Sequence, residues 1–279
     1  MVLNSHAKIN LSLTVNRKLI KGLHNIQSFF CIINLFDQIS LKKLKNKKRD
    51  QIHFSGPFSK YVNNSKNTVK KVLEIMRKKK LINHYYSVKV YKKIPVFSGL
   101  GGGTSNAASV FKSLIRKKVE KKIFNEIVNY VGSDFRLFFY KLAFLKDLNK
   151  VVKLNKKYKL YFLIVFPNIK NSTKEVYSRL KRFSLLKPFV QKKIKSKDIF
   201  INTLKRNKND LQLTVEKKYP VIRKLLNSIE IEKGCYFSRM TGSGSACYGL
   251  FMSEHCSKAA LNSLRKKYPK FWFSIAKTI

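Results

Sequence analysis

Glycines in this chain gather in one short segment beside two hydroxyl-bearing residues. Only 11 of the 279 residues are glycine, and four of these lie in Gly99–Gly103, directly before Thr104 and Ser105. Glycine lets backbone N–H groups approach an anion closely and tolerates positive φ. Successive N–H groups in such a turn form a concavity that binds anions. The segment 95–106 therefore predicts a site for nucleotide phosphates, in which the two hydroxyls serve phosphate oxygens or a Mg²⁺ ion.

The spacing of this segment separates it from two common nucleotide-binding patterns. It is not a Walker A motif, because no Gly-Lys pair precedes the hydroxyls, and Thr104 stands where the last glycine of G-x-G-x-x-G would be. A flexible loop that caps a helix is the competing interpretation. The residues expected to bind the nucleotide are Pro95, Val96, Phe97, Ser98, Gly99, Leu100, Gly101, Gly102, Gly103, Thr104 and Ser105.

A second glycine cluster, Gly242, Gly244 and Gly249, lies within residues 240–249 and precedes an apolar strand. Alone it indicates a tight turn as readily as a ligand site. Its value as a signal depends on its pairing with the first cluster.

The elements around the first cluster suit phosphate binding. Residues 87–91 predict a strand before it, and Thr104–Lys118 predicts a helix after it, because Ala107, Ala108, Phe111, Leu114 and Ile115 follow helical spacing. A helix N-terminus adds unpaired N–H groups and the positive pole of the helix dipole. We therefore expect the glycines to form a strand-to-helix turn.

The remaining chain predicts a mixed, partly antiparallel α+β fold. Residue 67 is an asparagine that could cap a helix running to about residue 80. Residues 183–210 are Lys-rich and fit a surface helix and loop. Further strands are expected at 7–15, 29–35, 160–166, 246–252 and 271–277, and further helices at 211–232 and 255–267.

Length and composition indicate two packed lobes. We place the boundary between residues 155 and 156, before the buried strand 160–166 that opens the second lobe. No apolar run approaches the roughly 18 residues needed to span a bilayer, and the start lacks the pattern of a signal peptide, so we expect a cytoplasmic protein. The four cysteines form no C-x-x-C pair and are expected to be free, buried thiols.

The formal charge of +46 suggests nucleic-acid binding at first sight. However, the basic residues are 49 Lys and only 11 Arg, spread over nearly every segment. Because Arg is favoured for bidentate phosphate and base contacts, this distribution indicates solvated surfaces, with some non-specific affinity for polyanions.

Three segments together resemble the GHMP kinase superfamily: residues 7–11 (AKINL), the 95–106 loop and the 240–249 loop. The superfamily fold implies an N-terminal lobe like domain 2 of ribosomal protein S5 and a ferredoxin-like C-terminal lobe. The N-terminal block, Gly22-Leu23-His24 and Gly132-Ser133-Asp134 resemble the members that phosphorylate a hydroxyl of 4-diphosphocytidyl-2-C-methyl-D-erythritol in non-mevalonate isoprenoid synthesis. Asn209-Asp210 also matches these members.

By this resemblance Lys8 and Asp134 are the catalytic pair. A carboxylate can accept the proton of the attacking hydroxyl, and an ammonium steadies the developing charge. A solvated lysine and a helix N-cap are the plain alternatives. Asn10, His24 and Thr173 are implied substrate contacts, although His24 could equally be an ordinary histidine. Asn67 is implied to lie near the adenine, and it could also cap its helix.

The resemblance implies ATP and Mg²⁺ as cofactors, leaves the metal ligands open, and implies a small-molecule substrate with no specific nucleic acid and no membrane. We expect a monomer or a homodimer. Leu23 stands where the family usually has Tyr, which motivates a second hypothesis of a different small alcohol as substrate. A basic nucleic-acid-binding protein without kinase activity is the third.

Overall fold

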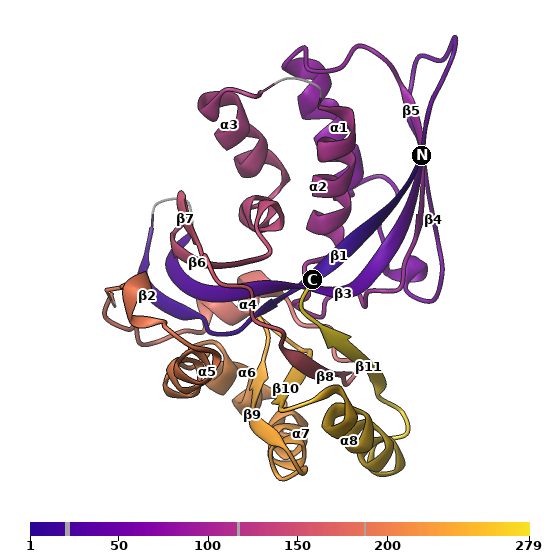
Figure 1. The fold of residues 1–279 in the computed structure, drawn as a ribbon. Helices are drawn as coiled ribbons and strands as arrows, with labels where there is room; N and C mark the ends of the chain where they lie inside the picture. Colours follow the sequence, from indigo (N-terminus) through magenta and orange to yellow (C-terminus); the bar gives the residue numbers. More distant parts are fainter. Residues whose placement is uncertain (20–22, 116–117, 187) are drawn as a thin grey trace. The chain divides into compact units, whose positions relative to one another are not determined.

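The computed structural model describes residues 1–19, 23–115, 118–186 and 188–279, which form two compact units (Figure 1). The first unit comprises residues 1–8, 35–96 and 101–139, and the second comprises residues 9–34, 97–100 and 140–279. The units interleave along the chain, because β1 (Val2–Asn10) and β3 (His24–Lys43) each contribute residues to both. The single lobe boundary expected after residue 155 stays a prediction.

In the first unit, β5 (Tyr86–Tyr91) pairs antiparallel with β3 and parallel with β4 (Gln51–Ser55). Helix α1 (Thr68–Lys78) packs against α2 (Gly102–Leu114) and α3 (Lys121–Val131), and η3 (Ser133–Phe139) packs against α2 and α3. The buried residues of α1 recur three and four positions apart, so one apolar face meets its neighbours; they are Val69, Val72, Leu73, Ile75 and Met76.

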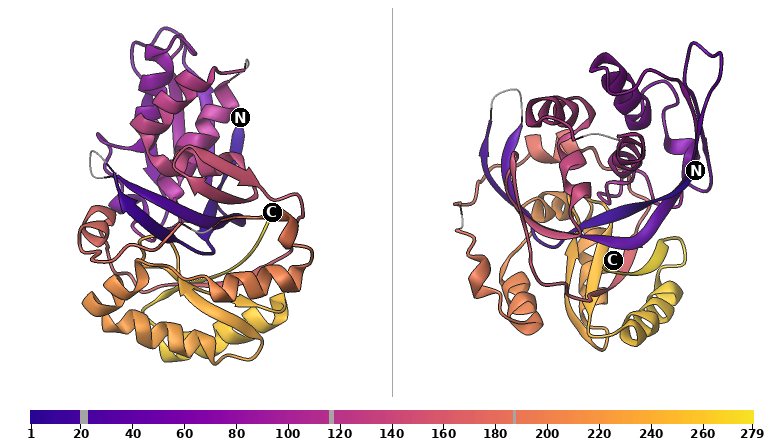
Figure 2. Two further views of the ribbon diagram at one scale, coloured as in Figure 1. Left: turned by 90° about the vertical axis from the view of Figure 1, so that its left-hand side faces the viewer. Right: turned by 45° about the horizontal axis from the view of Figure 1, so that its top comes forward.

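In the second unit, four antiparallel strands form a sheet in the order β11-β8-β10-β9. The strands are β8 (Tyr161–Phe166), β9 (Cys235–Met240), β10 (Cys247–Phe251) and β11 (Trp272–Lys277). Counted along the chain this order is 4-1-3-2. Helices α7 (Pro220–Glu230) and α8 (Glu254–Lys267) pack against the sheet, as the orange and yellow helices of Figure 2 show. This is the ferredoxin-like arrangement of strands and helices.

The second unit also contains three further strands. Strand β2 (Thr14–Lys18) pairs with β3, and β6 (Leu142–Asp147) pairs with both β3 and β7 (Lys150–Lys153). The shorter helical elements of the described chain are η2 (Ser59–Tyr61), α4 (Thr173–Ser178), η4 (Gln191–Lys193), α5 (Lys197–Arg206) and α6 (Gln212–Lys218).

Several predicted elements are confirmed with small shifts of their ends, and two are wrong. The single strand expected at 7–15 is divided, because the N–H groups of Leu11 and Ser12 both donate to the Phe29 carbonyl at 2.7 and 3.2 Å, which breaks the strand ladder after Asn10. The helix expected at 211–232 is two helices, α6 and α7, since Pro220 cannot continue the first and begins the second.

Other predicted ends differ less. The strand expected at 29–35 is the core of the longer β3. The helix expected from Thr104 begins two residues earlier and ends at Leu114, because Ile115 is extended; residues 116–117 of that prediction lie outside the described residues. The Lys-rich segment 183–210 contains η4 and α5, as expected of a helix and loop. Residue 187 of this segment also lies outside the described residues.

All four cysteines are free, and Cys31 and Cys247 are buried while Cys235 and Cys256 are half-buried. Burial raises the pKa of the Cys31 and Cys247 thiols, so these two remain protonated near neutral pH. Among the described residues, no helix combines the length and apolar character needed to cross a bilayer.

Candidate active site

The first glycine cluster forms the turn that begins α2. Gly101 precedes the helix with φ of 71°, in the left-handed region that glycine adopts without strain. The Ser105 N–H closes the first helical turn onto the Gly101 carbonyl at 2.8 Å. The N–H groups of Gly102, Gly103 and Thr104 have no acceptor inside the helix, by helix geometry. This turn therefore presents a row of backbone donors, as the sequence predicts.

The two hydroxyls after the glycines differ in their surroundings. Ser105 is 2% exposed, and its Oγ donates to the His6 carbonyl at 2.6 Å and lies 2.8 Å from the Ser5 Oγ. Thr104 is only half-buried. The Ser105 side chain thus fixes the helix to β1, whereas the Thr104 hydroxyl is the more accessible of the two.

Lys8 and Asp134 form an ion pair in the first unit, with 3.3 Å between the Lys8 Nζ and the Asp134 Oδ2. The Lys8 side chain is 4% exposed on β1, whereas Asp134 is 38% exposed. Asp134 lies within the first turn of η3, just after Gly132, the residue that ends α3. The ammonium is thus held in the fold while the carboxylate keeps access to solvent.

The start of α2 lies directly beside this ion pair. A Cβ atom at Gly101 would stand 3.2 Å from the Cγ and Cε of Lys8 and 2.9 Å from the Cζ of Phe138. Only glycine allows so close an approach at that backbone conformation. The structure therefore brings the predicted catalytic pair and the predicted phosphate-binding turn together within one unit.

Asn67 caps α1, as expected, because its Oδ1 accepts from the Lys70 N–H at 2.8 Å. Its Nδ2 donates to the Asn64 carbonyl at 3.0 Å. The next residue, Thr68, donates its hydroxyl to the Gly103 carbonyl at 2.6 Å. Sequence reasoning missed Thr68, since a hydroxyl at the start of a helix is most simply explained as part of the cap. Through Thr68, the N-terminus of α1 is tied to the glycine turn.

The two glycine clusters meet in the second unit, within which Phe97–Leu100 and residues 240–249 both lie. A Cβ atom at Gly99 would fall 2.4 Å from the Thr241 carbonyl oxygen, and the Ala246 N–H donates to the Ser98 carbonyl at 3.0 Å. This backbone contact is a physical reason for glycine in the first cluster. The second cluster is therefore a structural support for the first, beyond an isolated tight turn.

Two of the predicted substrate residues contact the second cluster. The Asn10 N–H donates to the Thr241 Oγ1 at 3.0 Å, and the Asn10 Nδ2 donates to the Ser28 Oγ at 2.8 Å. The Thr173 Oγ1 lies 2.8 Å from the Ser243 Oγ. The loop between β9 and β10 thus holds the backbone of Asn10 and the side chain of Thr173, whereas the Asn10 side chain is held by Ser28 of β3.

Asn209 also holds this loop, with its Nδ2 donating to the carbonyls of Met240 and Gly242, each at 2.8 Å. Its neighbour Asp210 accepts the Val15 N–H at 2.8 Å. The Asn209-Asp210 pair found in the sequence therefore serves the architecture of the loop and of β2.

His24, the third predicted substrate residue, lies among aromatic rings. Its ring centroid is 4.7 Å from that of Tyr177 and 6.2 Å from that of Phe183. Burial, and then the nearby Lys18 ammonium, lower the pKa of His24 below its usual 6.5. The imidazole is therefore neutral at pH 7 and can both donate and accept a hydrogen bond. Gly22, which precedes it in the sequence motif, lies outside the described residues.

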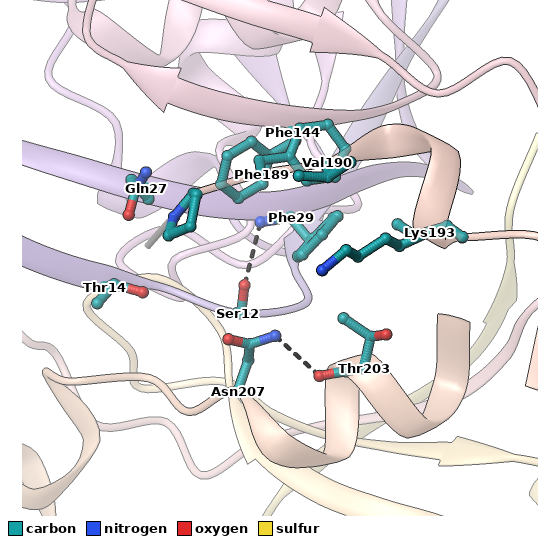
Figure 3. A pocket seen from close by; sticks show the side chains of 12 residues that line it. Ser12, Thr14, Gln27, Phe29, Phe144, Phe189, Val190, Lys193, Thr203 and Asn207 are labelled. Atoms are coloured by element: carbon teal, nitrogen blue, oxygen red, sulfur yellow. Dashed lines mark hydrogen bonds between the residues drawn. The ribbon is translucent and has the colours of Figure 1, made fainter. Parts of the chain in front are cut away.

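Figure 3 shows a cavity of about 230 Å³ in the second unit, and His24 is not among the residues that line it. Its lining includes Thr14 and Gln27, which pair with each other across β2 and β3. The next pair along these strands, Val15 and Ile26, faces the apolar core. Since successive side chains alternate between the faces of a sheet, His24 shares the core-facing side with Ile26. The cavity is therefore on the opposite face of β3 from His24.

The chain matches two family models and several curated relatives. Residues 67–133 match the GHMP kinases N terminal domain, and residues 189–270 match the GHMP kinases C terminal domain. A 4-diphosphocytidyl-2-C-methyl-D-erythritol kinase from Pelagibacter ubique is 36% identical over 284 residues, covering 99% of this chain and 98% of the relative. A kinase of the same name from Wolbachia pipientis wMel is 33% identical and covers 95% of this chain and 94% of the relative. Another from Caldanaerobacter subterraneus is 30% identical and covers 99% of this chain and 96% of the relative.

Solved structures share the fold. A 4-(cytidine 5'-diphospho)-2C-methyl-D-erythritol kinase has a TM-score of 0.75 at 21% identity, covering 99% of both chains. Homoserine kinase from Cytophaga hutchinsonii has a TM-score of 0.71 at 16% identity, covering 100% of this chain and 93% of that chain.

The two-sheet α+β architecture, the glycine turn at the start of α2 and the two domain matches define the chain as a GHMP kinase. Within this class, identity above 30% over nearly the whole chain shows that it belongs to the family of 4-diphosphocytidyl-2-C-methyl-D-erythritol kinases.

Proposed function

We propose that this chain transfers the γ-phosphoryl group of ATP to a hydroxyl of 4-diphosphocytidyl-2-C-methyl-D-erythritol, in the synthesis of isoprenoid precursors by the non-mevalonate route. The observation that carries this proposal is the Lys8–Asp134 ion pair beside Gly101, at the start of the phosphate-binding helix. The names and identities of the relatives supply the substrate. The proposed location is the cytoplasm, and a monomer or homodimer stays the expected assembly.

In this proposal Asp134 accepts the proton of the acceptor hydroxyl as the oxygen attacks the γ-phosphorus. A new P–O bond forms to the substrate, the bond from the γ-phosphorus to the bridging oxygen breaks, and ADP leaves. The Lys8 ammonium orients the carboxylate and offsets negative charge that develops on the transferred group. The exposed fraction of Asp134, 38%, leaves its carboxylate accessible to a substrate.

The backbone donors of Gly102, Gly103 and Thr104 would hold the nucleotide phosphates, with the rest of residues 95–105 as the surrounding loop. Mg²⁺ is held in such sites by one or two oxygen ligands together with phosphate oxygens. The Thr104 hydroxyl at the start of α2 fits the role of one such oxygen ligand, and the described residues contain no cluster of three His, Cys, Asp or Glu. When bound, the ion would neutralise charge on the phosphates.

The cytidyl part of the substrate would be bound through His24, with Asn10 and Thr173 as further polar contacts. A neutral imidazole can pair with the edge of a cytosine, and the rings of Tyr177 and Phe183 beside it can stack on the base. Leu23 stands where the family usually has a tyrosine, and the rings of Tyr177 and Phe183 lie near His24 instead. This arrangement favours the cytidyl alcohol over a different small alcohol.

The test is an assay of ADP release with and without the cytidyl alcohol, on the wild-type chain and the Asp134→Asn variant. We expect turnover that depends on the alcohol, and a decrease in kcat of about 10²–10⁴ for the variant, the usual contribution of a general base. Asp134→Asn leaves the buried Lys8 ammonium without its counter-ion and should also lower stability. The thermal midpoint of the variant is therefore measured, and kcat is compared at a temperature at which both chains are folded.

Full activity of the variant would refute the role of Asp134. A higher kcat/KM for an alcohol without the cytidyl group would refute the proposed substrate while keeping the reaction class.

A further inference from the structure

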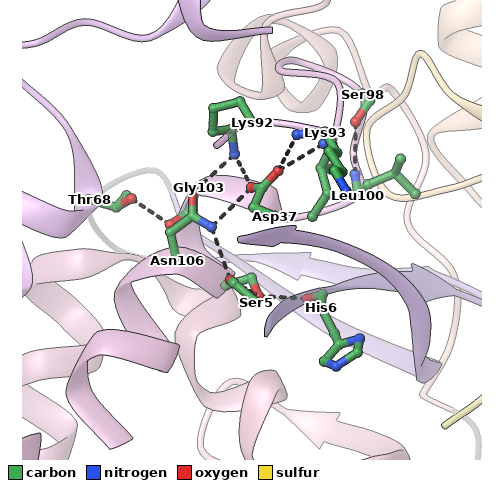
Figure 4. Close-up of polar contacts among 12 residues, drawn as sticks. Ser5, His6, Asp37, Thr68, Lys92, Lys93, Ser98, Leu100, Gly103 and Asn106 are labelled. Carbon is green, nitrogen blue, oxygen red and sulfur yellow. Dashed lines mark hydrogen bonds and ion pairs between the residues drawn. The ribbon is translucent and has the colours of Figure 1, made fainter. Parts of the chain in front are cut away.

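A buried ion pair, formed by Asp37 of β3 and Lys92 just after β5, lies beside the first turns of α2 in the first unit (Figure 4). The side chains are 0% and 2% exposed. Among the ion pairs of the described chain, none of the others has both side chains below 5% exposure. Neither residue is used by the reaction proposed above.

The Asp37 carboxylate receives four donors. Its Oδ1 accepts the N–H groups of Lys93 at 2.7 Å and Ile94 at 2.9 Å, and its Oδ2 accepts from the Lys92 ammonium and from the Asn106 Nδ2 at 3.0 Å. Lys93 and Ile94 lead directly into Pro95, the first residue of the predicted nucleotide loop. Asp37 therefore fixes the backbone that enters this loop.

Asn106 connects the same ion pair to α2. Its Oδ1 accepts from the Lys92 Nζ at 3.0 Å, and its Nδ2 also donates to the Ser5 Oγ at 3.0 Å. Ser5 lies on β1, the strand that carries Lys8, and its hydroxyl contacts Ser105. One polar network thus joins the first turns of α2, the strand that carries Lys8 and the entry to the loop.

The network also touches the backbone of the turn. A Cβ atom at Gly102 would lie 2.9 Å from the Ile94 Cγ2 and 3.3 Å from the Lys92 Nζ. Lys92 and Ile94 therefore pack closely against the residue that begins the helix. An error of about 1 Å in the placement of a reacting group can cost about 100-fold in rate, so the position of this turn is functionally sensitive.

From these contacts we infer that Asp37, Lys92 and Asn106 are positioning residues, which hold the N-terminal turn of α2 in the geometry that binds ATP. A purely stabilising role is the competing explanation. It is the weaker one, because a buried ion pair often adds little stability compared with well-packed apolar residues. A polar network whose members are all paired, however, specifies one arrangement of the segments that it joins. The inference rests on the proposed use of ATP, but not on the identity of the acceptor.

The test measures ATP binding by calorimetry, in the presence of Mg²⁺, for the wild-type chain and the Asn106→Ala variant, which cuts the link to α2 and leaves the ion pair in place. We expect at least a 10-fold loss of ATP affinity, and a KM for the cytidyl alcohol within 2-fold of the wild-type value. The control is Leu41→Ala, a buried substitution on β3 of the same unit, which should leave ATP affinity within 2-fold despite a lower thermal midpoint.

A second pair of variants keeps the test decisive if Asn106→Ala does not fold. Asp37→Asn alone leaves a buried ammonium without its counter-ion and should weaken ATP binding. Adding Lys92→Gln restores neutral hydrogen bonds to Asn106 and should recover at least 5-fold of the lost affinity. Wild-type ATP affinity in Asn106→Ala, an equal loss in Leu41→Ala, or no recovery in the double variant would overturn the inference. A chain that binds ATP but does not phosphorylate the cytidyl alcohol would refute the proposed function alone.

Discussion

Lys8 is the one charged residue among the buried residues of β1, and its ammonium is paired with the Asp134 carboxylate. Lysine is almost never fully buried unless it is paired, and Lys8 is 3% exposed beside Asp134. The position of Gly101 against its side chain fixes where the ammonium lies. At the scale of single residues, the site is therefore determined by one buried cation and the glycine that allows it to approach the helix.

His24 gives a prediction about pH. Burial and Lys18 lower the pKa of its imidazole below 6.5, so the folded chain binds this proton at a lower pH than the unfolded chain does. As pH falls below 6.5, the unfolded state therefore binds more protons than the folded state does. The free energy of unfolding should decrease as pH falls from 6.5 through the lower pKa of folded His24. An NMR titration of the His24 Hε1 signal should give a midpoint below 6.5.

The Lys18→Gln variant should raise this midpoint only in part, because burial is the larger cause. The signal is assigned by its disappearance in His24→Gln. A wild-type midpoint at or above 6.5 would contradict the environment described here.

At the scale of elements, the observed cap of α1 and the predicted adenine contact of Asn67 can be tested separately. Asn67→Ala removes the cap of α1 and should cost about 1 kcal/mol of unfolding free energy in urea. Asn67→Asp keeps an oxygen acceptor for the Lys70 N–H but removes the amide donor. If Asn67 also contacts the adenine, the Asp variant should raise the KM for ATP. It keeps the cap and loses only the bond from the Asn67 Nδ2 to the Asn64 carbonyl, so it should lose less stability than Asn67→Ala.

Ser253→Ala is the matched control, because Ser253 caps α8 through the Cys256 N–H at 3.1 Å. It should show a similar loss of stability, about 1 kcal/mol, with no change in the KM for ATP. An unchanged KM in Asn67→Asp would reduce Asn67 to a helix cap.

At the scale of the whole molecule, the net charge of +46 is the dominant feature. It predicts non-specific binding to any polyanion through counter-ion release, falling by about 10³–10⁵ between 50 and 200 mM salt for 6–10 phosphate contacts. Fluorescence anisotropy with two unrelated RNA duplexes measures this. Equal affinities that vanish together at high salt are expected, whereas a sequence preference that persists would favour the nucleic-acid-binding alternative.

Patterns among residues close together in the chain were sufficient to predict several helices, one helix cap and the candidate phosphate-binding loop. The glycines before Thr104 predicted a strand-to-helix turn, Asn67 predicted a cap, and helical spacing predicted α1 and α8, because each depends on neighbours a few residues away. The family resemblance added Lys8 and Asp134, which no spacing rule connects. Residue type and local periodicity thus determined the class of fold and the candidate loop.

Tertiary packing decided the rest. The sequence held no sign that Asp37 and Lys92 pair beside α2, that Thr68 bonds Gly103, or that Gly99 lies against Thr241. Strands β4, β6, β7 and β9 were also missed, since short strands acquire their character from the neighbours with which they pair. Contacts between residues distant in the chain form only when burial and pairing across the whole unit offset the loss of conformational entropy, so no local pattern encodes them.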